Sequence, residues 1–152
     1  MGPVVLISMC LLGIDCRYDG GGNAVAGLDR LRGLCQLVPV CPEQLGGLPT
    51  PRTPSERLGS RVVTRDGGDV TSAFERGAEQ VCRLVSQFGA RYALLKARSP
   101  SCGTGEIYDG SFTGRKVAGD GVTAERLRAM GLRLFDETQI DPLIQALEGD
   151  KL

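Results

Sequence analysis

Short, continuous apolar runs constrain the fold of this chain more than any other feature of its sequence. Four such runs are rich in Val, Leu and Ile and do not alternate with polar residues: Val4–Ser8, Gln36–Val40, Tyr92–Leu95 and Leu132–Phe135. Continuous runs of this length are typical of strands that are buried on both faces of a parallel sheet. The sequence therefore predicts four strands of a mainly parallel sheet.

Helical patterns lie between and after these runs. In residues Thr71–Phe88 the apolar side chains recur on one helix face, a Thr or Ser at the start is the expected cap, and Gly89 follows as a stop. Residues Val122–Met130 predict a second helix with Thr123 as its cap, and Asp141–Leu147 predict a short terminal helix. Strands that alternate with helices predict an α/β fold. We expect one Rossmann-like domain with flanking helices over residues 1–152.

Two stretches interrupt this alternation. Residues Arg61–Thr71 place Asp66-Gly67-Gly68 between apolar residues, a pattern typical of a β-hairpin. Residues Gly103–Gly121 are glycine-rich and predict a long irregular excursion. Long loops in compact domains are usually functional or mobile.

Charge and hydropathy exclude several classes of protein. The 18 Lys and Arg residues balance the 18 Asp and Glu residues, and no long basic run favours binding to phosphate backbones. We therefore expect a small substrate and no nucleic-acid partner. No apolar stretch approaches the roughly 18 residues of a membrane span. The first residues also lack the basic region of a signal peptide, so we expect a cytoplasmic protein with no membrane partner.

The chain has six cysteines and no histidine. In a cytoplasmic protein six cysteines indicate metal binding or catalysis rather than a disulfide framework. The absence of histidine removes the commonest general base and the commonest nitrogen ligand. Any metal must therefore be held by thiolates and carboxylates.

Three of the cysteines follow the ends of predicted strands. Cys10 lies two residues after the first strand, Cys41 directly follows the second, and Cys102 lies in the loop after the third. The carboxyl ends of parallel strands meet at one edge of the sheet, where ligands bind, so we expect these thiols to converge. Cys35 and Cys82 are interpreted as packing residues. Cys16 is left open as a fourth ligand, a thiol that contacts a ligand, or a catalytic thiol.

The spacing of these cysteines bears on the kind of metal. Structural zinc usually takes closely spaced cysteine pairs, and the sequence contains no C-x-x-C motif. Three dispersed thiolates without histidine suit an iron–sulfur cluster with one iron open to substrate. The spacing alone is weak support for iron over zinc, and both remain open at this point.

Glu43 and Ser101 lie beside two of these cysteines in the sequence. A carboxylate next to a metal-bound substrate acts as a general acid or base, and a hydroxyl holds a water molecule or donates to a developing charge. The competing interpretation is that Glu43 pairs with Arg52 and Ser101 caps a turn. The sequence supports both equally. Further basic and aromatic residues are expected near the same edge: Arg17, Arg52, Lys96, Arg98, Tyr18 and Tyr108.

Four motifs, in order, resemble the thiouracil desulfidase family, which was long catalogued as a bacterial domain of unknown function. They are SMCLLGIDCRYDG from Ser8, PVCPEQLGGLPTPR from Pro39, LKARSPSCG from Leu95 and IYDGSFTG from Ile107. The resemblance covers nearly the whole chain. Met9, where the family usually has a small residue, is interpreted as a packing change.

The resemblance implies a 4Fe-4S cluster bound by Cys10, Cys41 and Cys102, with its fourth iron free to bind the sulfur of a thiolated pyrimidine. It also implies that Glu43 and Ser101 are the catalytic residues. The implied reaction is a non-redox conversion of thiouracil to uracil and sulfide. We expect the cluster to be lost easily during purification in air, and the protein to be a monomer or weak homodimer.

Two other functions remain open from the sequence. One is a thiol-based sulfur transfer or redox enzyme that uses Cys16 with Cys10 or Cys102. The other is a non-catalytic module that binds iron–sulfur clusters or zinc. The physiological substrate is not specified by the sequence.

Overall fold

A four-stranded parallel sheet forms the centre of the fold. The computed structural model describes residues 2–150. The strand order is β2-β1-β5-β8, with bounds β1 Val4–Ser8, β2 Gln36–Val40, β5 Tyr92–Leu95 and β8 Arg133–Asp136. All three pairings are parallel, which confirms the predicted sheet. β8 begins one residue later than predicted, because the Leu132 amide closes the turn after the preceding helix by donating to the Leu127 carbonyl.

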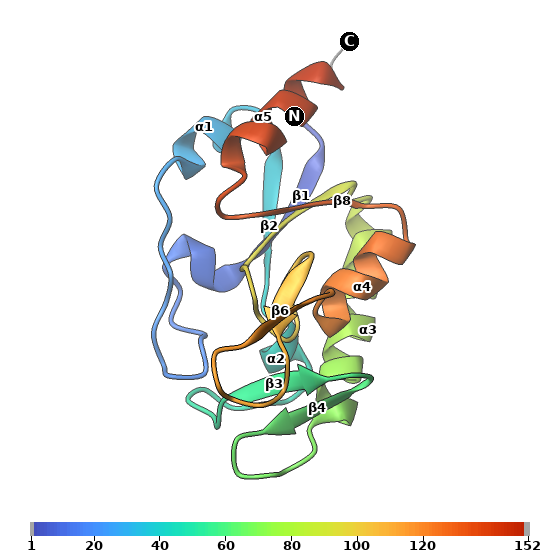
Figure 1. Cartoon of the computed structure of the whole chain (residues 1–152). Helices are drawn as coiled ribbons and strands as arrows, with labels where there is room; N and C mark the ends of the chain where they lie inside the picture. The colour runs from blue at the N-terminus through green and yellow to red at the C-terminus, as the bar shows by residue number, and fades with distance from the viewer. Residues whose placement is uncertain (1, 151–152) are drawn as a thin grey trace.

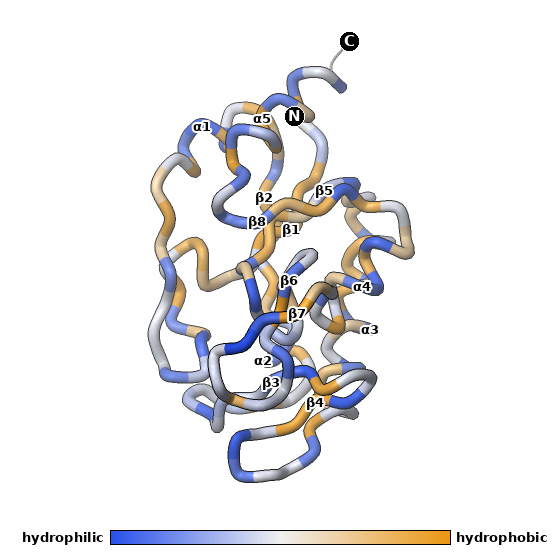
Figure 2. Tube along the Cα trace, in the orientation of Figure 1, coloured by the Kyte–Doolittle hydropathy of each residue, from blue (hydrophilic) through white to orange (hydrophobic). Residues whose placement is uncertain are grey.

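Helices cover both faces of this sheet (Figure 1). On one face lie α3 (Thr71–Phe88) and α4 (Val122–Ala129), and on the other lie α1 (Leu28–Arg32) and α5 (Ile140–Gly149). The alternating side chains of β1 reach the two layers: Leu6 packs with the α3 and α4 residues, whereas Val5 and Ile7 pack with those of α1 and α5. This arrangement explains why the strands are continuously apolar. Figure 2 shows the same pattern, with apolar colour along the inner strands and polar colour in the peripheral loops.

The start of α3 differs from its prediction. Its N-cap residue is Val70 rather than a Thr or Ser, and the Thr71 amide donates to Oδ1 of Asp69 at 2.9 Å. The Thr71 hydroxyl instead accepts a hydrogen bond from the Val62 amide, so it joins the helix to a neighbouring strand. Gly89 ends the helix in the left-handed conformation (φ 66°), as predicted.

The start of α4 also differs. Gly121 is its N-cap residue, and Thr123, predicted as the cap, lies fully buried in the first turn. The amides of the first turn donate to loop carbonyls of Pro100 and Ser101, so no side-chain cap is needed. α5 extends the predicted terminal helix at both ends.

Two small hairpins extend the fold beyond the central sheet. β3 (Ser55–Leu58) pairs with β4 (Arg61–Thr64), and β6 (Glu106–Tyr108) pairs with β7 (Lys116–Ala118). The turn predicted within 61–71 is present: Val63 and Asp69 form an antiparallel bridge, and the Val70 amide donates to the Val62 carbonyl at 2.9 Å. The segment after this turn is not a regular strand, and the main partner of β4 is the preceding strand, β3. The second hairpin gives structure to the excursion predicted over 103–121.

Two short helices follow the strand ends. The 3-10 helix η1 (Met9–Leu12) follows β1, and α2 (Pro42–Leu45) follows β2 and packs on α3. Within residues 2–150, none of the helices combines the length and apolar character that crossing a membrane requires.

Candidate active site

A cavity of about 500 Å³ lies at the carboxyl edge of the parallel sheet. Its walls include Cys10, Cys16, Cys41 and Cys102, together with Glu43, Ser101 and several basic and aromatic side chains. The structure therefore brings the three strand-end thiols to one place, as the strand order predicts. Cys35 and Cys82 lie outside this cavity: Cys35 is buried beside α1 and donates to the Leu31 carbonyl, and Cys82 is half-buried on α3.

The strand register aligns the loops that carry these thiols. Ser8, the last residue of β1, is paired with Val40, the last residue of β2, so Cys10 and Cys41 leave the sheet side by side. On the other side of β1, the Ser8 hydroxyl accepts a hydrogen bond from the Lys96 amide at 2.9 Å, just after β5 ends. The loop to Cys102 therefore starts at the same edge.

The Cys102 loop is fixed by a dense set of hydrogen bonds. The Ser99 hydroxyl accepts from the amides of Ser101 (3.1 Å) and Cys102 (3.0 Å). The Ser101 carbonyl accepts from the amides of Thr123 and Ala124 in the first turn of α4. The loop is therefore held from both sides, which places the Ser101 hydroxyl and the Cys102 sulfur next to each other.

Burial dominates the electrostatics of the thiols. The Cys102 thiol is buried and its pKa is raised to about 12, although hydrogen bonds from Ser8 and Ser101 act in the opposite direction. Burial followed by the charges of Cys41 and Cys10 raises the pKa of Cys16 to about 12. Burial also raises the pKa of Cys10. Metal binding to such thiols must displace protons.

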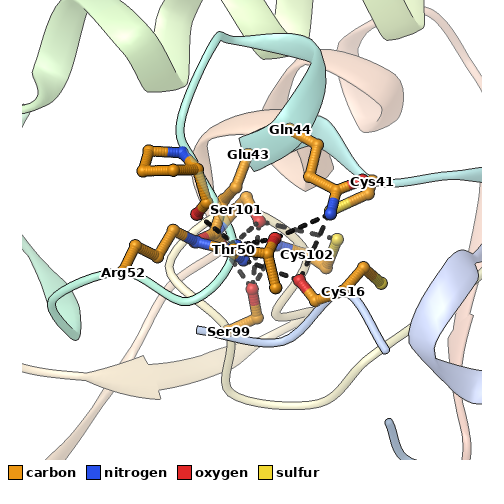
Figure 3. Close-up of polar contacts among 10 residues, drawn as sticks. Cys16, Cys41, Glu43, Gln44, Thr50, Arg52, Ser99, Ser101 and Cys102 are labelled. Carbon is orange, nitrogen blue, oxygen red and sulfur yellow. Dashed lines mark hydrogen bonds and ion pairs between the residues drawn. The ribbon is translucent and has the colours of Figure 1, made fainter. Parts of the chain in front are cut away.

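Glu43 and Ser101 are in direct contact (Figure 3). The Ser101 hydroxyl donates to Oε2 of Glu43 at 3.1 Å, and it lies 3.6 Å from the Cys102 sulfur. Glu43 is the second residue of α2, two residues after Cys41. The carboxylate and the hydroxyl predicted from the sequence therefore form one hydrogen-bonded pair beside the thiols.

Arg52 holds the other oxygen of Glu43. Its Nε donates to Oε1 at 2.9 Å, and both side chains are largely buried. Its guanidinium also donates to the carbonyl of Cys16 at 3.0 Å and to the hydroxyl of Thr50 at 3.0 Å. The Glu43–Arg52 pair, predicted as the alternative to a catalytic role, is therefore present. It uses Oε1 of Glu43 and leaves Oε2 to accept from Ser101. The two interpretations of Glu43 are therefore compatible.

The remaining residues predicted near this edge are found there. Arg17, Lys96, Arg98, Tyr18 and Tyr108 all line the cavity. Arg17 pairs with Asp19 and Lys96 pairs with Glu137, so their charges are partly compensated. Glu56, Arg65 and Phe112 also line the cavity and were not among the predicted site residues. Phe112 belongs to the motif that begins at Ile107. Its side chain reaches the cavity through a left-handed backbone conformation (φ 58°), which the sequence does not predict for a phenylalanine.

The donor set fits an iron–sulfur cluster better than a single ion. Within the part of the chain that the structure describes, no three Cys, Asp or Glu side chains converge on one ion position. Cluster ligands each bind a different iron, so they surround a space instead of meeting at a point. Here the predicted ligands are buried thiols around a cavity of about 500 Å³, and the sequence has no histidine. Thiolate ligands of this kind suit iron–sulfur chemistry.

The fold and the thiol-lined cavity place this chain among α/β proteins with a ligand crevice at the carboxyl edge of a parallel sheet. The model of the 2-thiouracil desulfurase family matches residues 5–139. The chain therefore belongs to this family, and the resemblance noted in its motifs is confirmed.

Two individual proteins are similar over nearly their whole length. A solved structure described as the 4Fe-4S-dependent thiouracil desulfidase TudS is 47% identical, with a TM-score of 0.92, and covers 96% of this chain and 98% of that one. The uncharacterized protein YbbK of Bacillus subtilis (strain 168) is 38% identical in an alignment 151 residues long, which covers 93% of this chain and all of YbbK.

Proposed function

We propose that this chain is an iron–sulfur-dependent desulfidase that converts the C=S group of a thiolated pyrimidine, such as thiouracil, into C=O. The overall reaction consumes one water and releases one sulfide as H₂S or its conjugate base. No electrons are transferred, so no redox partner is required. The observation that carries the proposal is the Glu43–Ser101 hydrogen bond of 3.1 Å beside the buried Cys102 thiol.

The three thiols of Cys10, Cys41 and Cys102 are the proposed ligands of a 4Fe-4S cluster. Their convergence from three separate loops around one cavity supports this assignment. When bound, such a cluster supplies an open iron that acts as a Lewis acid toward the substrate sulfur.

Proton movement is assigned to Glu43 and Ser101. The Ser101 hydroxyl orients a water molecule toward the thiocarbonyl carbon, and Oε2 of Glu43 accepts the proton that this water loses on attack. The same carboxyl group then returns this proton to the departing sulfur, and the hydroxyl left on the carbon loses its proton to solvent as C=O forms, so Glu43 ends the cycle as it began. Glu43 comes from the helix after β2 and Ser101 from the loop after β5, two strands that flank β1, and the hydrogen bond between the side chains orients them before substrate arrives.

Arg52 has a positioning role in this scheme. By donating to Oε1 of Glu43 it leaves only Oε2 to exchange protons with the reaction, and by donating to the Cys16 carbonyl it ties the acid to the Cys10–Cys16 segment.

The thiol-based alternative is less well supported. A nucleophilic cysteine needs a lowered pKa and access to solvent, whereas the Cys16 thiol is buried and its pKa is raised. The free state of all six cysteines supports a reducing cytoplasmic location. We infer that the substrate is a small molecule, since a cavity of this size suits small ligands.

The test is anaerobic cluster reconstitution followed by an assay for sulfide released from 2-thiouracil and 4-thiouracil. We expect turnover by the wild-type protein, loss of bound iron in Cys102→Ser, and retained iron with little turnover in Glu43→Gln. Cys82→Ser, outside the cavity, is the matched control and keeps full iron and turnover. Sulfide release by Cys102→Ser at the wild-type rate contradicts the proposal. Turnover that survives iron chelation favours the thiol-based alternative.

A further inference from the structure

The β6–β7 hairpin supplies a wall of the cavity that the proposed chemistry does not use. Tyr108, Phe112 and Gly114 from this hairpin line the cavity. The segment between its strands, residues 109–115, lies against β3 of the neighbouring hairpin (Figure 1). We call this segment the hairpin loop.

Glu56 of β3 fixes the conformation of the hairpin loop. Its Oε1 accepts hydrogen bonds from the amides of Gly110 (3.0 Å) and Phe112 (3.1 Å). At Gly110, which has φ of 96°, an added Cβ would lie 2.9 Å from the Cβ of Leu58, so the loop packs tightly on β3. A half-buried carboxylate that accepts two amides holds the loop more firmly than packing alone.

Phe112 has a backbone conformation that bulky residues rarely adopt. Its φ is 58°, in the left-handed region that costs free energy for any residue with a large side chain. Within residues 2–150, the other non-glycine residue with positive φ is Arg98, at φ of 65°, and it lines the same cavity. Both strained positions of the described chain therefore belong to one site, where strain is usually retained because it positions a functional group.

The Phe112 ring is half-buried and forms part of the cavity wall. The guanidinium carbon of Arg65 lies 5.7 Å from the ring centroid, at cation–π distance, which favours one ring orientation. Two tyrosines also line the cavity, but neither has a strained backbone. Tyr18 is 44% exposed, and Tyr108 lies within the regular strand β6. Phe112 is thus an aromatic ring whose placement is maintained by both a dedicated carboxylate and a neighbouring cation.

We propose that Phe112 is the specificity-determining residue that stacks on the face of the pyrimidine ring, and that Glu56 is its positioning residue. This inference rests on the proposed function. In the proposed reaction the water held by Glu43 and Ser101 approaches the thiocarbonyl carbon from one face of the ring, so the opposite face is left for an apolar or aromatic partner. Stacking of a base on an aromatic side chain provides that partner, and it requires the planar face of an aromatic ring.

The experiment compares the reconstituted wild-type enzyme with Phe112→Leu, which keeps apolar volume without a ring, and with Phe112→Tyr, which keeps the ring. We expect Phe112→Leu to raise KM for 4-thiouracil about tenfold with a small change in kcat, and Phe112→Tyr to remain within about twofold of wild type. Phe88→Leu is the matched control, because Phe88 is exposed at the end of α3, away from the cavity.

A second readout separates stacking from a general loss of structure. Uracil and 5,6-dihydrouracil carry the same carbonyl and amide groups, but only uracil has a planar aromatic ring. Equilibrium dialysis against the reconstituted protein should show tighter binding of uracil by the wild type, and near-equal binding of the two compounds by Phe112→Leu. Glu56→Ala should reduce the preference in the same direction, and Glu56→Gln, which keeps an oxygen acceptor, should restore it.

The outcomes also distinguish this inference from the proposed function. A wild-type protein that binds uracil with the aromatic preference but releases no sulfide contradicts the proposed function and leaves the stacking role supported. A wild-type protein that desulfurates thiouracil, with KM and the uracil preference unchanged in Phe112→Leu, overturns the stacking role. Absence of any uracil preference in the wild type overturns it as well.

Discussion

Gly77 of α3 lies directly against the carbonyl of Pro42 in α2: a Cβ added at Gly77 would stand 1.9 Å from that oxygen. No side chain larger than hydrogen fits between the two helices at this point. α2 begins at Pro42, carries Glu43 and directly follows Cys41, so the contact sets the depth at which both groups enter the cavity.

The Gly77 contact leads to the first prediction. Gly77→Ala should destabilise the protein by about 1–3 kcal/mol through overpacking and should also lower desulfuration, because α2 must move away from α3. Chemical unfolding and sulfide release measure the two effects. Gly149→Ala is the matched helical control: a Cβ at Gly149 meets nothing within 4 Å, so stability should stay equal or rise. Equal stability of Gly77→Ala and wild type would contradict the predicted clash.

Arg52 provides the second prediction. Arg52→Lys keeps the charge but loses the fork that reaches Glu43, Thr50 and the Cys16 carbonyl together. We expect activity to fall about 10- to 100-fold, as for other residues that orient catalytic groups. Iron content is measured together with sulfide release. Unchanged iron with slower sulfide release places the defect in the catalytic step, whereas reduced iron places it in cluster binding. Arg83→Lys, an exposed helix pair with Glu79, should retain full activity.

Thr123 provides the third prediction. Its side chain is fully buried, and its hydroxyl has no hydrogen-bond partner within the described chain. Thr123→Val replaces this hydroxyl with a methyl group of similar size, so the free energy of unfolding should rise by about 1 kcal/mol. Thr71→Val removes a hydroxyl that accepts from the Val62 amide and should be destabilising instead. A loss of stability in Thr123→Val would show that its hydroxyl is satisfied.

Asp120 provides the prediction on pH. Burial raises the pKa of its carboxyl group, but the hydrogen bonds from Arg128 and from the Gly105 amide outweigh burial and lower it below the ordinary value of 3.8. The stabilisation from this lowered pKa is present above that value and is lost as the pH falls through the lower folded-state pKa.

Asp120→Asn should therefore reduce the free energy of unfolding of the metal-free protein at pH 6 and have a smaller effect near pH 3. Urea unfolding at the two pH values measures this difference. Asp29→Asn, at an exposed ion pair, should have little effect at either pH. If Asp120→Asn lowers the free energy of unfolding equally at pH 6 and pH 3, the carboxyl group of Asp120 does not have the lowered pKa.

The central sheet and the convergence of thiols could be predicted from the sequence because burial on both faces leaves a continuous apolar run. Val4–Ser8, Gln36–Val40 and Tyr92–Leu95 have the predicted bounds for this reason. Strand order and register then place Cys10, Cys41 and Cys102 at one edge. The roles assigned to these residues and to Glu43 and Ser101 remain predictions for the experiments above.

The parts that were not predicted depend on contacts between distant segments. β3 and α2 are only four residues long and have no strong local pattern, so pairing with β4 and packing on α3 determine them. The expected cap at Thr123 was wrong because loop carbonyls satisfy the helix amides there. Glu56 and Phe112 are separated by 56 residues, and no local pattern could indicate their hydrogen bond.

The cavity takes its thiols from segments that follow three different strands, and the last of these strands, β5, lies between β1 and β8. On the proposed ligand assignment, a partly synthesised chain that ends before Cys102 lacks one of the three ligands. A cluster that needs all three of these thiols is therefore completed only after synthesis has passed Cys102.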